Sequence, residues 1–272
     1  MPHPSEAVIR VENLTQHYGV RAVLRNIDLE IFAGELVAVI GPNGMGKTTL
    51  LSAIAGVHSP QKGSVTIGGF RRRSTPEAEL DIRRMAVYLP DNAFLPRTMT
   101  AREFWISVGK LYDVDYDRLF DHVERLVALF ELESVVDSPI SSGSAGQQKK
   151  VALSAALITD TPILLLDEPL SGGLDASGIL ALRKVLQRLV VDRQATIVMT
   201  APVPELVEQL ATRVVVLRAG TIVADGSVAE LKAQAGRGGS LADALERLFF
   251  PQTADHVADY FQDGPRFQDG PQ

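Results

Sequence analysis

Cysteine is absent from the 272-residue chain, and the sequence also lacks an excess of positive charge. Without cysteine, a disulfide framework and a metal site with thiolate ligands are both excluded. The 27 lysines and arginines stand against 33 acidic residues, which gives a formal net charge of −6. Proteins that bind the phosphate backbone of DNA or RNA usually carry a basic patch, so we expect no nucleic-acid partner.

Long hydrophobic runs are missing as well. Stretches such as Leu36–Ile40 are far shorter than the ~20 apolar residues that cross a bilayer. The first ten residues, MPHPSEAVIR, do not contain the apolar segment of a signal peptide. A role at a membrane would therefore require a partner that supplies the membrane-spanning part.

What is present is an ordinary globular composition, with 46% hydrophobic and 22% charged residues. Strand-like stretches occupy residues 8–31, and a continuous apolar strand follows over 35–40. Helical spacing replaces the strands from 98 to about 130, and strands and helices then alternate from 147 to 217. This order predicts an α/β fold with a mainly parallel sheet wrapped by helices, a small N-terminal β subdomain and an inserted helical subdomain.

The chain is expected to contain one large domain. We place this domain at 1–235 and its helical subdomain at about 98–158. Residues 236–272 are expected to form a short helical extension and a flexible tail. The tail repeats the sequence FQDGP at 261–265 and 267–271, and its glycines and prolines favour flexibility.

The strongest local pattern is GPNGMGKTT, which follows the apolar strand directly. Its glycines allow the backbone to turn successive N–H groups toward phosphate, next to the positive end of the following helix. Lys47 is expected to reach the β and γ phosphates and Thr48 to hold Mg²⁺. The alternative is a glycine-rich turn before an ordinary helix, and the preceding apolar strand argues against it. The residues expected to contact nucleotide here are Gly41, Pro42, Asn43, Gly44, Met45, Gly46, Lys47, Thr48 and Thr49.

A second pattern, ILLLDEP at 163–169, is a buried-type strand that ends in two carboxylates. We expect Asp167 to hold Mg²⁺ through water and Glu168 to polarise an attacking water. An acidic pair after a strand also occurs in surface loops and helix caps. The phosphate loop upstream favours the catalytic interpretation, with Glu168 and Lys47 as catalytic residues.

These two segments and GQQKKVALSAALITDTP at 146–162 together resemble the nucleotide-binding domain of ABC (ATP-binding cassette) transporters, over about residues 8–231. The resemblance implies a P-loop NTPase fold of ABC type, with ATP and Mg²⁺ as ligands. It also implies a second cassette, identical or different, and a separate transmembrane permease. The protein is then expected at the cytoplasmic face of the cell membrane.

The resemblance assigns further contacts with ATP. In this family a signature sequence caps a helix and contacts the γ-phosphate bound to the opposite cassette, and here that place is taken by Ser144, Ala145, Gly146 and Gln147. A Ser/Gly-rich linker that simply caps a helix is the alternative. Tyr18 matches the aromatic residue that stacks on adenine. LSGG at 170–173 follows the acidic strand and belongs to the dimer-contacting loop, in which Gly173 is an extra residue.

Two departures from the family concern hydrolysis. Asp91 replaces the usual Gln, and it remains a candidate metal ligand beside Thr48 and Asp167. Pro202 stands where an ungapped match places the family's γ-phosphate-contacting His, and proline has neither a side-chain donor nor an N–H. Thr200 is the nearest hydroxyl that can replace this donor. We expect ATP binding to survive and hydrolysis to be slow.

Three functions are compared. The first is an active transport ATPase, with export favoured by the YLPD segment at 88–91 and the helical extension. The second is a degenerate regulatory cassette that binds ATP but hydrolyses little. The third, a cassette protein of translation or DNA maintenance, lacks the expected second cassette or basic arms. Contact with the permease is expected at 91–105, through Phe94, Leu95 and Trp105.

Overall fold

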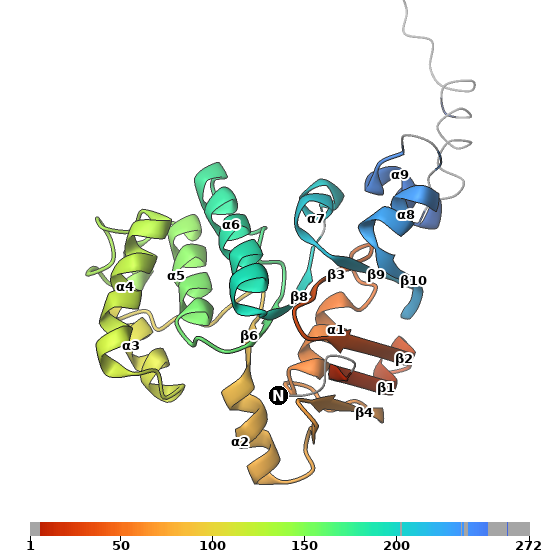
Figure 1. Ribbon diagram of the computed structural model, residues 1–272, viewed down its shortest axis with the longest axis horizontal. Coiled ribbons are helices and arrows are strands. Elements are labelled where there is room, and N and C mark those ends of the chain that lie inside the picture. The colour runs from red at the N-terminus through yellow and green to blue at the C-terminus, as the bar shows by residue number, and fades with distance from the viewer. Residues whose placement is uncertain (1–5, 202, 235, 237–238, 250–259, 261–272) are drawn as a thin grey trace, which may run out of the picture.

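The chain folds into two β-sheets with helices packed around them (Figure 1). The structure is a computed structural model that describes residues 6–201, 203–234, 236, 239–249 and 260. The smaller sheet is antiparallel, with the strand order β2-β1-β4-β5. Its strands are β1 (Ala7–Tyr18), β2 (Arg21–Phe32), β4 (Lys62–Ile67) and β5 (Phe70–Arg71).

The larger sheet forms the centre of the molecule, with the strand order β10-β9-β3-β8-β7-β6. The pairs from β9 to β6 are parallel, and β10 joins β9 antiparallel at one edge. The strands are β3 (Leu36–Ile40), β6 (Ala86–Leu89), β7 (Ile163–Leu166), β8 (Thr196–Thr200), β9 (Arg213–Arg218) and β10 (Thr221–Ser227). The α/β fold with a mainly parallel sheet is confirmed.

Helices cover the sheets and form one end of the molecule. The helices are α1 (Lys47–Ile54), α2 (Pro76–Met85), α3 (Ala101–Leu111), α4 (Tyr116–Phe130), α5 (Ala145–Leu157), α6 (Ala176–Arg193), α7 (Pro204–Leu210), α8 (Val228–Gln234) and α9 (Leu241–Phe249), with a short 3₁₀ turn at Ile140–Ser142. None of the described helices is long and apolar enough to cross a membrane.

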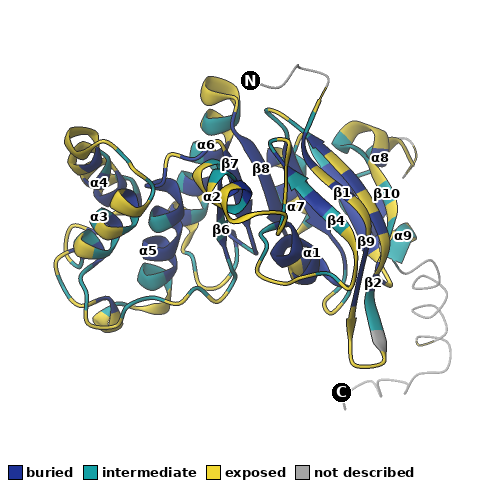
Figure 2. Cartoon of the chain, turned by 90° about the horizontal axis from the view of Figure 1, so that it is seen from below, coloured by how far each residue is buried: buried dark blue, intermediate teal, exposed yellow. Residues whose placement is uncertain are grey.

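Alternating side chains of β3 show how the central sheet is buried on both faces. Leu36, Ala38 and Ile40 join the core beneath the helical subdomain and α6. Val37 and Val39 join the second core, between the sheet, α1 and the N-terminal sheet. A parallel sheet covered on both faces requires near-continuous apolar strands, which is why β3, β7 and β8 read as unbroken hydrophobic runs. Figure 2 shows these strands as the buried centre of the molecule.

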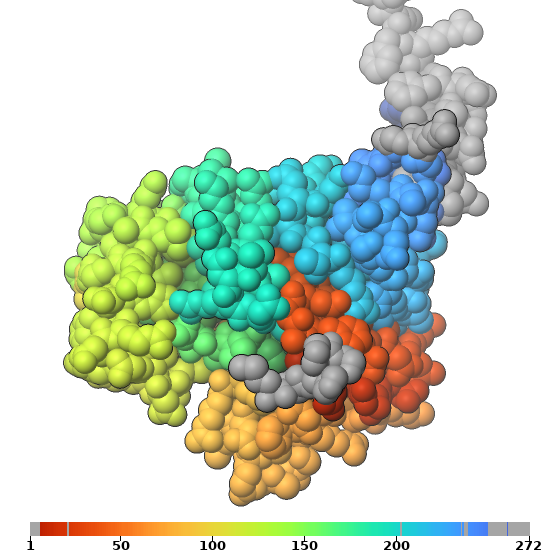
Figure 3. Space-filling view, viewed as in Figure 1, coloured from red at the N-terminus to blue at the C-terminus, as the bar shows by residue number. Residues whose placement is uncertain are grey.

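The helical subdomain, formed by α3, α4 and α5, lies at one end of the molecule, away from the N-terminal sheet (Figures 1 and 3). Trp105 of α3 is fully buried, and its Nε1 donates a hydrogen bond of 2.9 Å to the carbonyl oxygen of Val151 in α5. The prediction that Trp105 contacts a membrane partner is therefore wrong, because the side chain holds two helices together. Phe94, by contrast, is 90% exposed.

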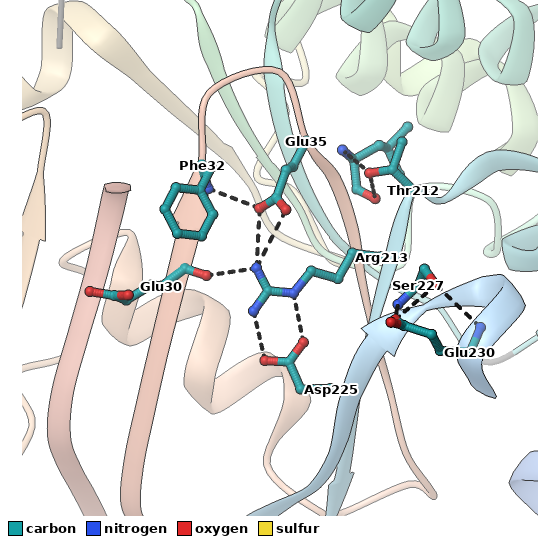
Figure 4. Close-up of polar contacts among 9 residues, drawn as sticks. Glu30, Phe32, Glu35, Thr212, Arg213, Asp225, Ser227 and Glu230 are labelled. Carbon is teal, nitrogen blue, oxygen red and sulfur yellow. Dashed lines mark hydrogen bonds and ion pairs between the residues drawn. The ribbon is translucent and has the colours of Figure 1, made fainter. Parts of the chain in front are cut away.

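Arg213 ties the two sheets together at the amino end of β3 (Figure 4). Its Nη1 donates to the carbonyl oxygen of Glu30 in β2 at 2.9 Å and to the Glu35 carboxylate at 3.2 Å. Its Nε and Nη2 bind the carboxylate of Asp225 in β10. The glycine-rich loop follows β3 at its opposite, carboxyl end.

Helix α9 lies in the range expected for a helical extension. Leu241 and Leu245 of this helix are buried in the main core. The two FQDGP repeats of the predicted flexible tail lie outside the described residues.

Candidate functional site

The site forms at the carboxyl edge of the central sheet, where β3, β6, β7 and β8 all end. In parallel sheets this edge is where ligands bind. The loop at 41–46 leaves β3, Asp91 follows β6, the two carboxylates follow β7, and Thr200 ends β8. Residues more than 100 positions apart in sequence are thus brought to one edge.

The glycines of the phosphate loop are required by space and by backbone conformation. Gly46 has a φ of 102°, and a Cβ there would lie 2.9 Å from the carbonyl oxygen of Val23. A Cβ on Gly41 would lie 2.3 Å from the carbonyl oxygen of Leu217. The amino end of α1 has no side-chain cap. Its first N–H groups and the positive end of its dipole are therefore available to phosphate.

Lys47 is buried within this loop. Its Nζ donates to the carbonyl oxygens of Gly41 at 2.8 Å and Pro42 at 3.3 Å. Burial lowers the pKa of the Lys47 ammonium, and the negative charges of Glu168 and Asp167 partly offset this effect. The lysine therefore shares an electrostatic environment with both carboxylates, as a phosphate-binding cation beside a metal site would.

Thr48 and Asp167 come together across the site. The Thr48 hydroxyl donates to Asp167 Oδ1 at 3.2 Å. The other carboxylate oxygen, Oδ2, is buried without a hydrogen-bond partner. A buried, unpaired carboxylate oxygen beside a threonine hydroxyl fits a Mg²⁺ ion, because oxygen atoms are its preferred ligands. The described residues hold no cluster of three or more His, Cys, Asp or Glu side chains, so phosphate and water would complete the coordination.

Thr200 links the two carboxylate positions. Its hydroxyl donates to Asp167 Oδ1 at 2.6 Å and accepts the N–H of Glu168 at 2.8 Å. The one hydroxyl hydrogen is therefore already used. The prediction that Thr200 replaces a missing γ-phosphate donor is wrong in this arrangement, because Thr200 positions the carboxylates instead.

Glu168 lies in a strained turn directly after β7. Its φ is +46°, in the left-handed region that residues other than glycine rarely adopt. Ser171 stabilises the turn, because its hydroxyl lies 3.0 Å from the carbonyl oxygen and 3.1 Å from Oε2 of Glu168. Strain of this kind is concentrated at functional sites, where it fixes the direction of a side chain.

Comparison with known proteins decides the family. A sequence model described as ABC transporter matches residues 24–171, just over half of the chain. The chain belongs to the ABC transporter family.

Curated relatives of this ABC ATP-binding subunit carry names from different transport systems. ABC transporter ATP-binding protein NatA of Bacillus subtilis is 33% identical over 212 residues, which cover 78% of this chain and 84% of that protein. Daunorubicin resistance ATP-binding protein DrrA3 of Streptomyces coeruleorubidus is 29% identical, with 85% and 72% covered. Sulfate/thiosulfate import ATP-binding protein CysA of Pseudomonas syringae is 34% identical, with 82% and 68% covered.

Solved structures agree with the ABC fold. A structure described as the ATP-binding subunit of an ABC transporter superposes with a TM-score of 0.79 at 28% identity, covering 89% of this chain and 99% of that one. The dimeric ATP-binding cassette MJ0796, bound to ADP and Pi, superposes with a TM-score of 0.73, covering 80% and 98%. At 24% identity, the second likeness shows the P-loop NTPase fold alone.

The predicted signature segment of this ABC subunit forms the start of α5. Ser144 caps the helix: its hydroxyl accepts the N–H of Gln147 at 3.2 Å, and Gln147 Oε1 accepts the N–H of Ser144 at 2.8 Å. A Cβ on Gly146 would lie 2.5 Å from the carbonyl oxygen of Gly173. No hydrogen bond among the described residues joins Ser144–Gln147 to the phosphate loop. Within one chain, Ser144–Gln147 packs instead on the loop that contains Gly173.

The loop predicted to contact a second cassette contains two glycines in left-handed conformation, Gly172 at φ 78° and Gly173 at φ 95°. Asp175 then caps α6 by accepting the N–H of Gly178 at 2.8 Å. The Lys150 ammonium of α5 lies 3.0 Å from the Asp175 carboxylate. Helix α5 thus holds this loop from one side.

Asp91 faces a second lysine of α5. Lys149 Nζ lies 3.4 Å from Asp91 Oδ1 and 3.3 Å from its carbonyl oxygen. Burial raises the pKa of the Tyr88 hydroxyl, and the negative charges of Asp167 and Asp91 raise it further. The sequence does not predict the pair with Lys149, which directs the Asp91 carboxylate toward α5.

Tyr18 lies at the end of β1 and is 51% exposed, and its ring is nearly perpendicular to that of His58 at a centroid distance of 6.4 Å. Its role toward adenine stays a prediction. Pro202 lies outside the described residues.

Proposed function

We propose that this ABC ATP-binding subunit hydrolyses ATP and powers substrate translocation through a separate transmembrane permease. The observation that carries the proposal is the hydrogen-bonded chain from Thr48 through Asp167 and Thr200 to the N–H of Glu168. These hydrogen bonds support the proposal, because they link the two proposed metal ligands and the proposed general base beside the phosphate loop. A cassette that only binds ATP would not require the base.

The residues have distinct roles in the proposed reaction. Lys47 and the N–H groups of residues 41–49 bind the phosphates. Thr48 and Asp167 hold Mg²⁺, which neutralises charge on the β and γ phosphates when it is bound. Glu168 orients a water molecule and accepts its proton as the water oxygen attacks the γ phosphorus and the bond to the bridging oxygen breaks.

Asp91 is a further candidate metal ligand in this proposal. Its carboxylate is now held by Lys149, so the pair would have to open before Asp91 reaches a metal. The segment Ser144–Gln147 is proposed to complete the site of a second cassette, because no hydrogen bond among the described residues joins it to the phosphate loop of its own chain. ATP would then lie between two cassettes, identical or different.

The permease contact is proposed at the loop after β6. Phe94 is almost fully exposed there, and Leu95 is partly buried against the core. Such a contact would hold the subunit at the cytoplasmic face of the cell membrane. We infer export from the YLPD segment at 88–91 and from α9; curated relatives include proteins named for both import and export.

The test is steady-state phosphate release by three proteins: the unmodified chain, Glu168→Gln and Pro202→His. We expect Mg²⁺-dependent hydrolysis that Glu168→Gln abolishes. Pro202→His should raise the rate, because one lost transition-state donor typically costs about 10²- to 10³-fold. Equal, near-background release from the unmodified chain and Glu168→Gln would instead favour the degenerate regulatory cassette. Rapid Glu168-dependent release that Pro202→His leaves unchanged would show that Pro202 is no handicap.

A further inference from the structure

A second polar pocket lies away from the phosphate loop, and its lining comes from the end of α1, from β4 and β5, and from the residues before α2. Figure 1 labels α1, β4 and α2. Its volume of about 340 Å³ is near the lower end of the range for small-ligand sites, roughly 300–1,000 Å³. None of the residues proposed to bind ATP lines it. The lining that matters here is formed by Gly56, His58, Ser59, Arg71, Arg72 and Arg73, and we call it the arginine pocket.

Arg72 is held rigidly at this pocket. Its side chain is only 9% exposed. Its Nε donates to the carbonyl oxygen of Ile54 at 3.0 Å, and its Nη1 donates to Glu79 Oε2 at 2.9 Å. The guanidinium packs on Gly56, where a Cβ would lie 3.1 Å from Arg72 Cζ. A guanidinium has five N–H donors, so donors remain for a ligand on a side chain that is already positioned.

The neighbouring arginines add charge that is not neutralised. Arg73 Nη2 donates to the carbonyl oxygen of Gly56, and Arg73 N–H donates to Glu79 Oε1. Within the described residues, the Arg71 side chain has no hydrogen-bond or ion-pair partner. Of the three guanidinium groups, only that of Arg72 is paired with a carboxylate, Glu79, so the pocket is locally basic in a chain whose net charge is −6. The Ser59 hydroxyl lines the same pocket as a neutral donor.

We propose that the arginine pocket binds a phosphate group, carried by an anionic lipid headgroup or by a soluble phosphate compound. Planar guanidinium groups bind phosphate through paired, charge-assisted hydrogen bonds, which a single ammonium group does not offer. A fixed arginine also loses less side-chain entropy on binding than a solvated one. The pocket shares no lining residue with the proposed ATP site, which it adjoins through the contact of His58 with Tyr18, and binding of its ligand does not require hydrolysis.

The lipid arm of the test measures sedimentation of the full chain with vesicles of phosphatidylglycerol and phosphatidylcholine, and with vesicles of phosphatidylcholine alone. The variant is Arg71→Ala, because the Arg71 side chain makes no hydrogen bond or ion pair within the described residues. The matched control is Arg125→Ala, an arginine on α4 that is 76% exposed. Binding to the anionic vesicles should fall about fivefold in Arg71→Ala and stay unchanged in Arg125→Ala.

The soluble arm titrates pyrophosphate calorimetrically in a Lys47→Ala background, which removes phosphate binding at the ATP site. A dissociation constant that Arg71→Ala raises, and Arg125→Ala does not, would assign the pocket to a soluble phosphate. An effect confined to the anionic vesicles would assign it to a lipid headgroup. The proposal is overturned if neither probe binds, or if Arg71→Ala and Arg125→Ala weaken binding equally. Because ATP hydrolysis is not the readout, failure here leaves the proposed function standing.

Discussion

Thr200 is the residue on which the geometry of both carboxylates depends. Its hydroxyl is fully buried, and it bonds Asp167 Oδ1 and the N–H of Glu168 at the same time. Removing it would leave a buried N–H without an acceptor and would free the strained Glu168 turn. Thr200 acts as a positioning residue and has no assigned contact with phosphate.

Thr200→Val should therefore reduce both stability and hydrolysis. The unpaired polar groups should lower the free energy of unfolding by about 1–3 kcal/mol. Displacement of Glu168 should slow phosphate release by roughly 10- to 100-fold. Thr200→Ser keeps the hydroxyl and is the control, measured by denaturant unfolding and by phosphate release. If Thr200→Val hydrolyses ATP as fast as Thr200→Ser, the positioning role is wrong.

Individual residues of the site differ in how far the sequence predicts them. Local patterns predict the phosphate loop and the pair Asp167 and Glu168, because each directly follows an apolar strand in the sequence. Thr200 is predicted as a γ-phosphate donor and not as the partner of both carboxylates, and Lys149 is not predicted at the site. Their contacts are set by the register of β8 beside β7 and by the packing of α5, and no local pattern encodes either.

At the scale of elements, the buried parallel strands are the most predictable part of the fold. β3 and β7 lie within the apolar runs predicted at 35–40 and 163–169, because continuous apolar runs mark a sheet covered on both faces. The N-terminal region is less predictable. β1 and β2 are long paired strands, and shifts in their register disrupt the alternation of apolar and polar residues from which strands are predicted. Helix α2 and strand β10 are not predicted, since charged and polar residues dominate both.

The helical subdomain is held together by Trp105, whose ring is buried between α3 and α5. Trp105→Phe should lower the free energy of unfolding by about 1–3 kcal/mol, since the carbonyl oxygen of Val151 loses its buried donor. Phe94→Ala, at an exposed position, should change stability by no more than about 0.5 kcal/mol. Denaturant unfolding of both variants checks this difference. Equal effects would show that Trp105 does not anchor the subdomain.

The whole molecule presents the phosphate loop and the two carboxylates at one edge of the central sheet, and within the described residues no hydrogen bond joins the segment at the start of α5 to that loop. The proposed working unit is therefore a pair of cassettes that complete each other's sites. In each site, one chain supplies the phosphate loop and the carboxylates, and the other supplies Ser144–Gln147.

The most direct test of this account is the mass of Glu168→Gln in solution, measured by light scattering with and without saturating Mg-ATP. Blocking hydrolysis should trap the nucleotide between two chains, so the mass should rise from 29.4 kDa to about twice that value, by linkage of ATP binding to assembly. Adding Lys47→Ala should abolish the increase, since the phosphates then lose their buried cation. A mass that stays at 29.4 kDa with ATP bound would contradict a site shared between two copies of this chain.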